Sequence, residues 1–233
     1  MGCYELIAYP SITAVTQNLT INLDVSGNAT ITPREVNDNS GSTCGTAITL
    51  GLDQTTFNCS DLGANTVTLT ATETIGGAFN NASATITVVD AIAPIVVTQN
   101  LTLSLDASGN ASITTAEVNN GSSDNCTLAG SLALNLDVTA FTCADLGDNT
   151  VTLSVDDGNG NINSAIATVT VQDIISPVAL AQNITANILT GTSSVTITEG
   201  MIDNGSSDNC SITMSLSQTV FTCYEAGDNT VTL

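Results

Sequence analysis

The chain carries one pentapeptide three times, as Asn65-Thr66-Val67-Thr68-Leu69, Asn149-Thr150-Val151-Thr152-Leu153 and Asn229-Thr230-Val231-Thr232-Leu233. Within each occurrence, apolar residues alternate with threonine. This period of two is that of a β-strand with one buried face and one wet face. Threonine suits the wet face, because its β-branched side chain favours extended backbone. The pentapeptide therefore predicts a strand that recurs along the chain.

Other landmarks return in the same order around this strand, which indicates internal repeats. Gln17-Asn18-Leu19-Thr20 recurs at residues 99–102 and, as Gln-Asn-Ile-Thr, at residues 182–185. A Phe-x-Cys triplet precedes each pentapeptide. We therefore expect an N-terminal segment at residues 1–9, which is a linker or an exchanged strand, and three modules. They span residues 10–93, 94–176 and 177–233.

Short strands separated by Gly, Asn, Asp and Ser turns are typical of antiparallel β-sandwiches. We expect an all-β chain of tandem sandwich modules with a period of about 83 residues. The linkers at residues 90–94 and 173–177 contain no glycine and end in Pro94 and Pro177, so we expect the modules to form a stiff rod. The third module lacks its last strands. Either the chain continues beyond residue 233, or a neighbouring chain supplies strands.

Seven cysteines occur with no histidine and no Cys-x-x-Cys spacing, which excludes the usual zinc sites. Six of them form one close pair in each repeat: Cys44 with Cys59, Cys126 with Cys143, and Cys210 with Cys223. The recurrence predicts one disulfide within each module and an oxidising, extracellular location. Buried free thiols in a cytosolic protein are the alternative. Cys3 is left over; it pairs with another module or chain, or stays free.

The formal net charge is −21, because 22 acidic residues oppose one basic residue, Arg34. Nucleic-acid binding needs cations that this chain lacks, and so does docking on anionic lipid. Neither histidine nor lysine is present to act as a catalytic acid, base or nucleophile. Paired carboxylates are the only remaining chemistry, and the adjacent Asp156 and Asp157 are expected to point apart. We therefore expect no enzyme. No run reaches the ~18 apolar residues of a membrane span.

The order of the landmarks resembles that of hyalin-repeat (HYR) modules, above all the tandem modules of large surface proteins in Bacteroidetes-type bacteria. The shared features are the Ser-Gly-Asn turn at residues 26–28 and 108–110, the Asp-Asn-Cys loop at 124–126 and 208–210, the Phe-x-Cys triplet and the pentapeptide. The resemblance covers residues 10–233. It implies immunoglobulin-like sandwiches and a role in extracellular adhesion or cell-surface scaffolding. Many such modules carry a second cysteine pair, which would fall near Thr98 and Ser164, and this chain lacks it.

Two regions offer oxygen ligands to a hard cation such as Ca²⁺, although the fold requires no cofactor. The first is the turn at residues 156–161, which contains Asp156, Asp157, Asn159 and Asn161. A plain hairpin turn is the alternative there, because the same residue types form turns. The second is the junction between modules, where Asp90 or Asp173 would meet a loop acid of the next module, such as Asp124 or Asp208. Calcium there would offset the repulsion between the acids.

Asparagine-linked glycans are a further candidate modification. Asn18, Asn100 and Asn183 each begin an Asn-x-Thr sequon, which matters only in an organism that glycosylates asparagine.

These features predict a non-enzymatic structural protein of an extracellular filament or a cell-surface stalk that supports adhesion. Its partners at the cell surface are further copies of itself, associated head to tail, or further repeats of the same chain. The alternative function is that of a ligand-binding adhesin module, whose loops recognise a glycan or a partner protein.

Overall fold

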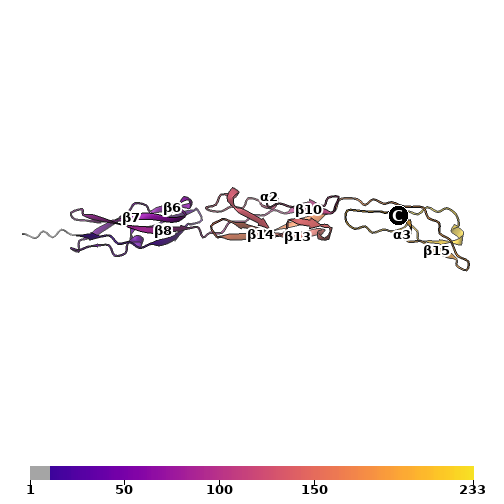
Figure 1. Ribbon diagram of the computed structural model, residues 1–233, viewed down its shortest axis with the longest axis horizontal. Helices are drawn as coiled ribbons and strands as arrows, with labels where there is room; N and C mark the ends of the chain where they lie inside the picture. Colours follow the sequence, from indigo (N-terminus) through magenta and orange to yellow (C-terminus); the bar gives the residue numbers. More distant parts are fainter. Residues whose placement is uncertain (1–10) are drawn as a thin grey trace, which may run out of the picture. The chain divides into compact units, whose positions relative to one another are not determined.

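The computed structural model describes residues 11–233; the predicted N-terminal segment and Cys3 lie outside the described residues. The described chain is all-β and immunoglobulin-like, as predicted (Figure 1). By contacts it divides into two compact units. Unit 1 comprises Met1–Val97, Gly121–Asn135 and Ser154–Ala165, and unit 2 comprises Thr98–Asn120, Leu136–Leu153 and Ile166–Leu233. The division into three modules and the stiff rod stay predictions. The first, second and third copies are the sequence repeats at residues 10–93, 94–176 and 177–233.

The first copy is built around a four-stranded sheet with the order β2-β8-β7-β5. Its strands are β2 (Leu19–Asn22), β5 (Ile48–Leu52), β7 (Gly63–Glu73) and β8 (Phe79–Val89). β8 runs antiparallel to β7 and parallel to β2. Two small antiparallel pairs complete the copy: β1 (Ile12–Thr13) with β4 (Gly41–Ser42), and β3 (Asn28–Thr30) with β6 (Thr56–Asn58).

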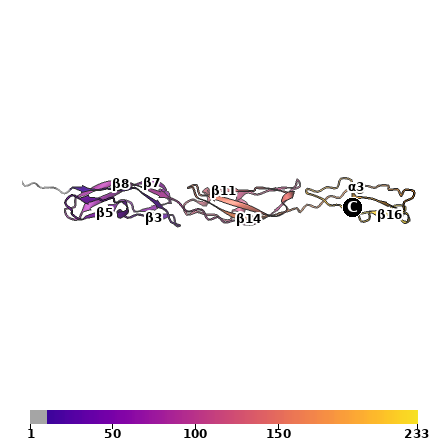
Figure 2. The ribbon, with the colours of Figure 1, turned by 90° about the horizontal axis from the view of Figure 1, so that it is seen from below.

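The recurring pentapeptide lies within β7, which confirms its prediction as a strand. Val67, Leu69 and Ala71 are fully buried, whereas the threonines between them are half-buried. β7 and β8 lie side by side in both ribbon views (Figures 1 and 2). One core cluster of the first copy combines Val67 of β7 and the inward residues of β8 with Phe57 from β6. Cys59 and Cys126 pack against the same cluster.

The second copy repeats this arrangement in a sheet with the order β11-β13-β14-β9. Its strands are β9 (Leu101–Ser104), β10 (Asn110–Ser112), β11 (Ala133–Leu136), β12 (Ala140–Thr142), β13 (Gly147–Asp156) and β14 (Ile162–Gln172). β10 pairs with β12, and β9 runs parallel to β14, as β2 does to β8. The buried row of β13 is Val151, Leu153 and Val155.

The third copy contains only one strand pair, β15 (Ser194–Thr196) with β16 (Val220–Thr222). Residues 183–189 and 228–233 form no strand, although they correspond to β2 and to the start of β7. Its buried core is correspondingly small and consists of Ile197, Ile202 and Phe221.

Single helical turns, which the repeat pattern did not predict, connect the strands. They are α1 (Pro33–Val36), α2 (Thr115–Val118), α3 (Glu199–Ile202), and the 3-10 turns η1 (Cys59–Asp61), η2 (Ala129–Ser131), η3 (Cys143–Asp145) and η4 (Cys223–Glu225). α1 begins after Thr32, whose N–H donates to the Glu35 carboxylate at 2.7 Å. Such a capping box satisfies backbone donors that a short helix leaves free. One turn is too short to show a 3.6-residue apolar period.

The predicted disulfides within each copy are wrong. Cys59 is bonded to Cys126 at 2.07 Å, and Cys143 to Cys210 at 2.05 Å, so each disulfide joins one copy to the next. Cys44 and Cys223 are free and exposed.

The geometry of the first copy explains why its own two cysteines cannot meet. Cys59 lies just before the start of β7, whereas Ser42 and Thr46, on either side of Cys44, bind Glu73 at its end. Eleven extended residues span about 35 Å, and a disulfide needs Cα atoms within about 7 Å.

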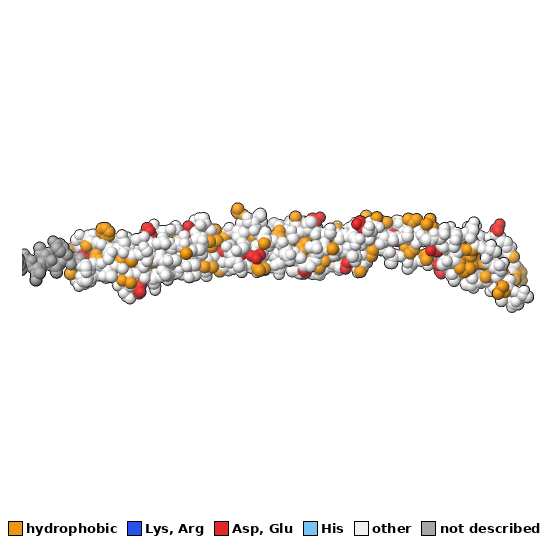
Figure 3. Space-filling view, viewed as in Figure 1, with side chains coloured by type: hydrophobic (Ala, Val, Ile, Leu, Met, Phe, Trp, Pro, Cys, Tyr) orange, Lys and Arg blue, Asp and Glu red, His pale blue; other side chains and the backbone are white. Residues whose placement is uncertain are grey.

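Acidic side chains are scattered over the face that Figure 3 shows. Among residues 11–233, no helix is long and apolar enough to cross a membrane.

Candidate functional site

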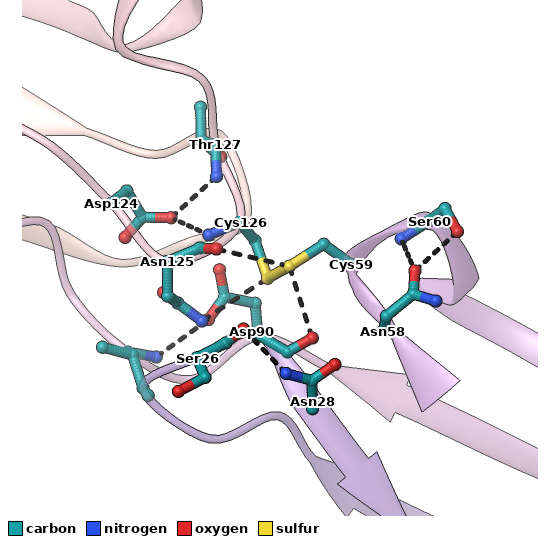
Figure 4. Close-up of a disulfide and its surroundings, with 12 residues drawn as sticks. Ser26, Asn28, Asn58, Cys59, Ser60, Asp90, Asp124, Asn125, Cys126 and Thr127 are labelled. Atoms are coloured by element: carbon teal, nitrogen blue, oxygen red, sulfur yellow. Dashed lines mark hydrogen bonds between the residues drawn. A yellow bond between two sulfur atoms is a disulfide. The ribbon is translucent and has the colours of Figure 1, made fainter. Parts of the chain in front are cut away.

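The disulfide between Cys59 and Cys126 lies at the centre of a junction within unit 1 (Figure 4). Cys59 opens η1 at the end of β6, and Cys126 belongs to the polar Asp-Asn-Cys loop of the second copy. The Asn125 carbonyl oxygen lies 3.5 Å from Cys59 Sγ. The Asn125 side-chain amide donates to the Asp24 carbonyl at 3.3 Å. The loop of the second copy is therefore bonded covalently to η1 of the first copy and by a hydrogen bond to Asp24.

Gly27 makes this close approach possible. Its φ of +72° lies in the left-handed region, where residues with a Cβ are strained. A Cβ at this position would lie 2.5 Å from Cys59 Sγ and 3.1 Å from the Asn125 oxygen. The glycine of the Ser-Gly-Asn turn is thus required both by the backbone and by the space that the disulfide occupies.

Unit 2 contains the same junction one repeat later. Cys143 Sγ lies 3.4 Å from the Asn209 carbonyl oxygen, and the Asn209 amide donates to the Asp106 carbonyl at 3.2 Å. Gly109 has a φ of +73°, and a Cβ there would lie 2.7 Å from Cys143 Sγ. The two junctions therefore share one design, and both disulfides have a sequence separation of 67 residues.

Three carboxylates converge beside the first disulfide. Asp90, Asp124 and Asp157 each offer an oxygen, and these oxygens all lie within 4.8 Å of one another. Asp90 is 3% exposed and Asp157 is 4% exposed. The three residues come from the linker, from the polar loop and from the hairpin between β13 and β14. Asp90 and Asp124 were expected at the junction, and Asp157 in the hairpin. The structure brings all three into one cluster.

Asp157 is buried because of its place along the chain. It continues the inward row of Val151, Leu153 and Val155 by one more step of two residues. Its carboxylate accepts hydrogen bonds from the Asn159 N–H at 2.7 Å and from the Asn161 side chain at 2.6 Å. Burial raises the pKa of Asp157, but these hydrogen bonds to the charged form outweigh it, so the net pKa lies below its ordinary value.

Asp90 is held by amide groups from two loops. Its Oδ1 accepts from the Asn125 side chain at 3.2 Å, and its Oδ2 accepts from the Asn159 side chain at 3.4 Å. The Asn161 side chain donates to the Asp90 carbonyl at 3.1 Å. Asn159 and Asn161, which were candidate metal ligands by residue type, therefore present their NH₂ groups to the cluster and orient its carboxylates.

Asp124 leaves one oxygen without a partner. Its Oδ2 accepts from the N–H groups of Cys126 and Thr127, both at 2.9 Å, whereas its Oδ1 is buried and accepts no hydrogen bond. The side-chain oxygen of Asn125 is buried and unbonded as well. Buried polar atoms without a partner are rare and costly.

The cluster also lacks a compensating charge. Among the described residues, no basic side chain pairs with these carboxylates, and the single Arg34 lies on α1. At 4.8 Å, two carboxylates repel each other by about 3.5 kcal/mol at an effective dielectric constant of about 20.

The donor set fits a hard cation. Calcium takes carboxylate and amide oxygens at 2.3–2.6 Å, so two of its ligands lie no more than about 5 Å apart. Oxygens of Asp90, Asp124 and Asp157 satisfy this limit. Unbonded buried oxygens occur at both junctions: those of Asp124 and Asn125 at the first, and those of Asp208 and Asn209 at the second.

Other predicted site residues lie elsewhere. Asp156 is not part of the cluster and accepts from the Gly158 N–H at 2.8 Å. Asp173 accepts from the Ile175 N–H at 3.1 Å; within residues 11–233 it is not part of a comparable acidic cluster. The sequon residues Asn18, Asn100 and Asn183 are exposed, and their glycosylation stays a prediction.

Sequence reasoning missed Glu73 as a buried acid. It occupies the position of Asp157 in the first copy, at the inward end of β7, and is 3% exposed. Ser42 and Thr46 donate their hydroxyl groups to it, which lowers its pKa. Strand parity was the available signal, because Glu73 follows Val67, Leu69 and Ala71 in steps of two.

Comparisons with protein families and with curated proteins find no match. Among solved structures, the chain is similar to Drosophila N-cadherin EC1-4, at 14% identity and a TM-score of 0.39, over 71% of this chain and 49% of that chain. Human Protocadherin-24 EC1-2 is 9% identical with a TM-score of 0.37, over 71% and 99%. An endo-fucoidan hydrolase of glycoside hydrolase family 107 is 14% identical with a TM-score of 0.26, over 70% and 29%. The chain covers 29% of that enzyme and 35% of a Protocadherin GammaB4 extracellular domain. At these scores the likenesses carry no argument about function.

Proposed function

We propose that the chain is a non-enzymatic structural protein of an extracellular filament or a cell-surface stalk that supports adhesion. The observation that carries this proposal is the pair of disulfides that bond each copy to the next. A disulfide inside a module stabilises that module alone, whereas a disulfide between modules fixes their connection. Structural disulfides persist in oxidising compartments, which supports a location outside the cytosol.

Calcium at the first junction is part of the proposal. Oxygens of Asp90, Asp124 and Asp157 would hold the ion, and it would supply the positive charge that the cluster lacks. Asn159 and Asn161 keep the carboxylates of Asp90 and Asp157 in place by hydrogen bonds. Because Asp90 follows β8 and Asp124 lies in the next copy, an ion bound by both would tie the linker to the loop.

The third copy supports association with a further strand. A groove of about 670 Å³ is lined by Ile184, Ile188, Ile197, Phe221 and Val231, among others. In the first copy, the corresponding residues Leu19, Leu23, Ile31, Phe57 and Val67 form one cluster with Ala84, Ile86 and Val88 of β8.

The groove therefore fits a strand with apolar residues at every second position. Such a strand would run parallel to residues 184–187, as β8 does to β2. It belongs either to a second copy of the chain or to further repeats of a longer one.

Electron microscopy of the native material tests the proposal. We expect filaments or stalks made of repeating units, and isolated particles of a single chain would overturn it. A denaturing gel run with reductant then separates the two architectures. A band at the chain mass of 23.6 kDa indicates a polymer of separate chains, whereas one very large band indicates a single long chain.

A further inference from the structure

We propose that Cys223 of one chain forms a disulfide with Cys44 of a second copy of the chain, so that chains are joined covalently head to tail. This inference rests on the proposed function and specifies the chemistry of its joint. Both internal disulfides join the cysteine of a Phe-x-Cys triplet to the cysteine of the polar loop in the next copy. Cys223 is the triplet cysteine of the third copy and Cys44 is the loop cysteine of the first, and both are free and exposed.

Cys223 is presented in the same way as the bonded triplet cysteines. It opens η4, as Cys59 opens η1. Thr222 N–H donates to the carboxylate of Glu225 at 2.7 Å, and Asn58 N–H donates to that of Asp61 at 2.8 Å. The Cys223 Sγ lies 3.7 Å from the Ser193 carbonyl oxygen. The Cys59 Sγ lies at the same distance from the Gly27 carbonyl oxygen. The thiol of Cys223 is therefore already held in the position that the other two use for bonding.

Cys44 is presented like the bonded loop cysteines. Its N–H donates to the hydroxyl oxygen of Ser42 at 3.3 Å, two residues earlier. In the second copy, the Cys126 N–H donates to the carboxylate of Asp124, also two residues earlier, at 2.9 Å. In both copies, a side-chain oxygen two residues earlier thus accepts from the cysteine N–H.

The loop of the first copy departs from the internal junctions at one contact. The first copy has Ser42-Thr43-Cys44 where the other loops have Asp-Asn-Cys. It therefore lacks the asparagine whose amide donates to the carbonyl of Asp24 or Asp106.

The third copy differs in sequence on the receiving side of the same contact. Residues 189–193 read Leu-Thr-Gly-Thr-Ser, and strand register places Ser193 at the position of Gly27 and Thr190 at that of Asp24. The joint between Cys44 and Cys223 would therefore lack the asparagine donor that both internal junctions have. Without the amide contact, the disulfide itself must hold the joint.

Bond formation needs a two-electron oxidant, for which we name a small-molecule or protein disulfide. The Cys223 thiolate attacks this disulfide and releases one thiol, which gives a mixed disulfide. The Cys44 thiolate of the next chain then attacks the Cys223 sulfur and releases the second thiol. The two cysteine protons leave with the released thiols, so the pair of cysteines is oxidised by two electrons and the oxidant is reduced by two.

Complementary single variants test the joint. All proteins carry Cys3→Ser, so that the thiol of Cys3 cannot form a competing disulfide between chains. The full chain, its Cys44→Ser variant and its Cys223→Ser variant are incubated with reduced and oxidised glutathione and run on a non-reducing denaturing gel. We expect a ladder in steps of 23.6 kDa for the parent and only monomer for each variant alone. An equimolar mixture of the two variants should give dimer and nothing larger, and mass spectrometry should find Cys223 linked to Cys44.

Three results would overturn the joint: a parent that stays monomeric, a mixture without dimer, or dimers of one variant alone, which would show that like cysteines pair. The proposed function is judged separately. Filaments in the microscope together with monomers on the gel would reject the disulfide and keep the filament. Covalent multimers without filaments would keep the disulfide and reject the filament.

Discussion

Gly27 and Cys59 lie so close together that a Cβ on Gly27 would be 2.5 Å from the Cys59 sulfur. We expect Gly27→Ala to destabilise unit 1 by more than the roughly 1–2 kcal/mol that a left-handed alanine costs by itself. Gly76→Ala is the matched control, because Gly76 has a φ of +88° and a Cβ there would meet nothing within 4 Å. Guanidinium unfolding of both variants measures the difference. If both variants lose the same free energy of unfolding, the space beside the Cys59 sulfur does not restrict residue 27.

The Cys59–Cys126 disulfide should account for a large share of the stability of unit 1. A loop of 67 residues corresponds to about 4 kcal/mol in the chain-entropy estimate. We expect the double variant Cys59→Ser/Cys126→Ser to lose stability on this scale in guanidinium unfolding. Cys44→Ser, which removes an exposed free thiol, should change little in the monomer. A larger loss from Cys44→Ser would contradict the observed pairing.

Calcium should reverse the effect of removing one carboxylate. Without calcium, Asp124→Asn relieves repulsion with Asp90 and Asp157, so its melting temperature should exceed that of the wild type. With calcium, the wild type should gain about 2.7 kcal/mol when the ion is at 100 times its Kd, and the variant should gain less. Asp228→Asn is the control, because Asp228 is exposed and lies outside the cluster. Thermal melting in chelator and in calcium tests this prediction. A wild-type melting temperature that is the same in both would exclude a structural ion.

Acid should destabilise the fold through its hydrogen-bonded carboxylates. The pKa of Glu73 is lowered first by the Ser42 hydroxyl and then by Thr46, so the unfolded chain binds this proton more readily than the folded one. The resulting stability is present above the ordinary value of 4.5 and is lost as the pH falls through the lower folded pKa. We expect melting temperatures that hold from pH 7 to 5 and then fall, with a shallower fall for Glu73→Gln. Acid also reduces the repulsion within the negatively charged chain, which acts in the opposite direction, and salt at about 0.15 M screens this repulsion. An NMR titration midpoint of Glu73 above 4.5 would contradict the direction.

Backbone amides of the third copy should exchange with solvent faster than those of the first. Residues 86–89 of β8 are paired with β2, and most of β8 is paired with β7, whereas residues 183–189 and 228–233 form no strand. Hydrogen exchange by mass spectrometry should therefore show protection in β8 and little in these two segments. In assembled material, the same segments should become protected. Exchange that stays fast after assembly would show that no strand enters the groove.

The strands could be predicted because their evidence is local. Val67, Leu69 and Ala71 show their buried face in the sequence itself, and the repeats multiply that signal. The disulfide pairing could not be predicted from such local evidence, because cysteines that are close in the sequence are not necessarily close in space. Cys44 and Cys59 are separated by the length of β7, whereas Cys59 and Cys126 meet where one copy follows another.

The acidic cluster was predictable in part. Asp90 and Asp124 were expected at a junction, and Asp157 in a hairpin, but their convergence depends on how β13 ends. Asp157 faces inward because it keeps the parity of Val155, and this rule also identifies Glu73. The roles of Asn159 and Asn161 depend on which side-chain atom points at the carboxylates. Residue type alone does not determine that.

Each disulfide also shields a length of polypeptide from tension. A pull on the two ends of the chain passes through the S–S bond, so the residues between Cys59 and Cys126 cannot be drawn out even if they unfold. Extended, 67 residues would add about 230 Å of contour length. With the second disulfide, more than half of the 233 residues are withheld from stretching, and reductant would release that hidden length.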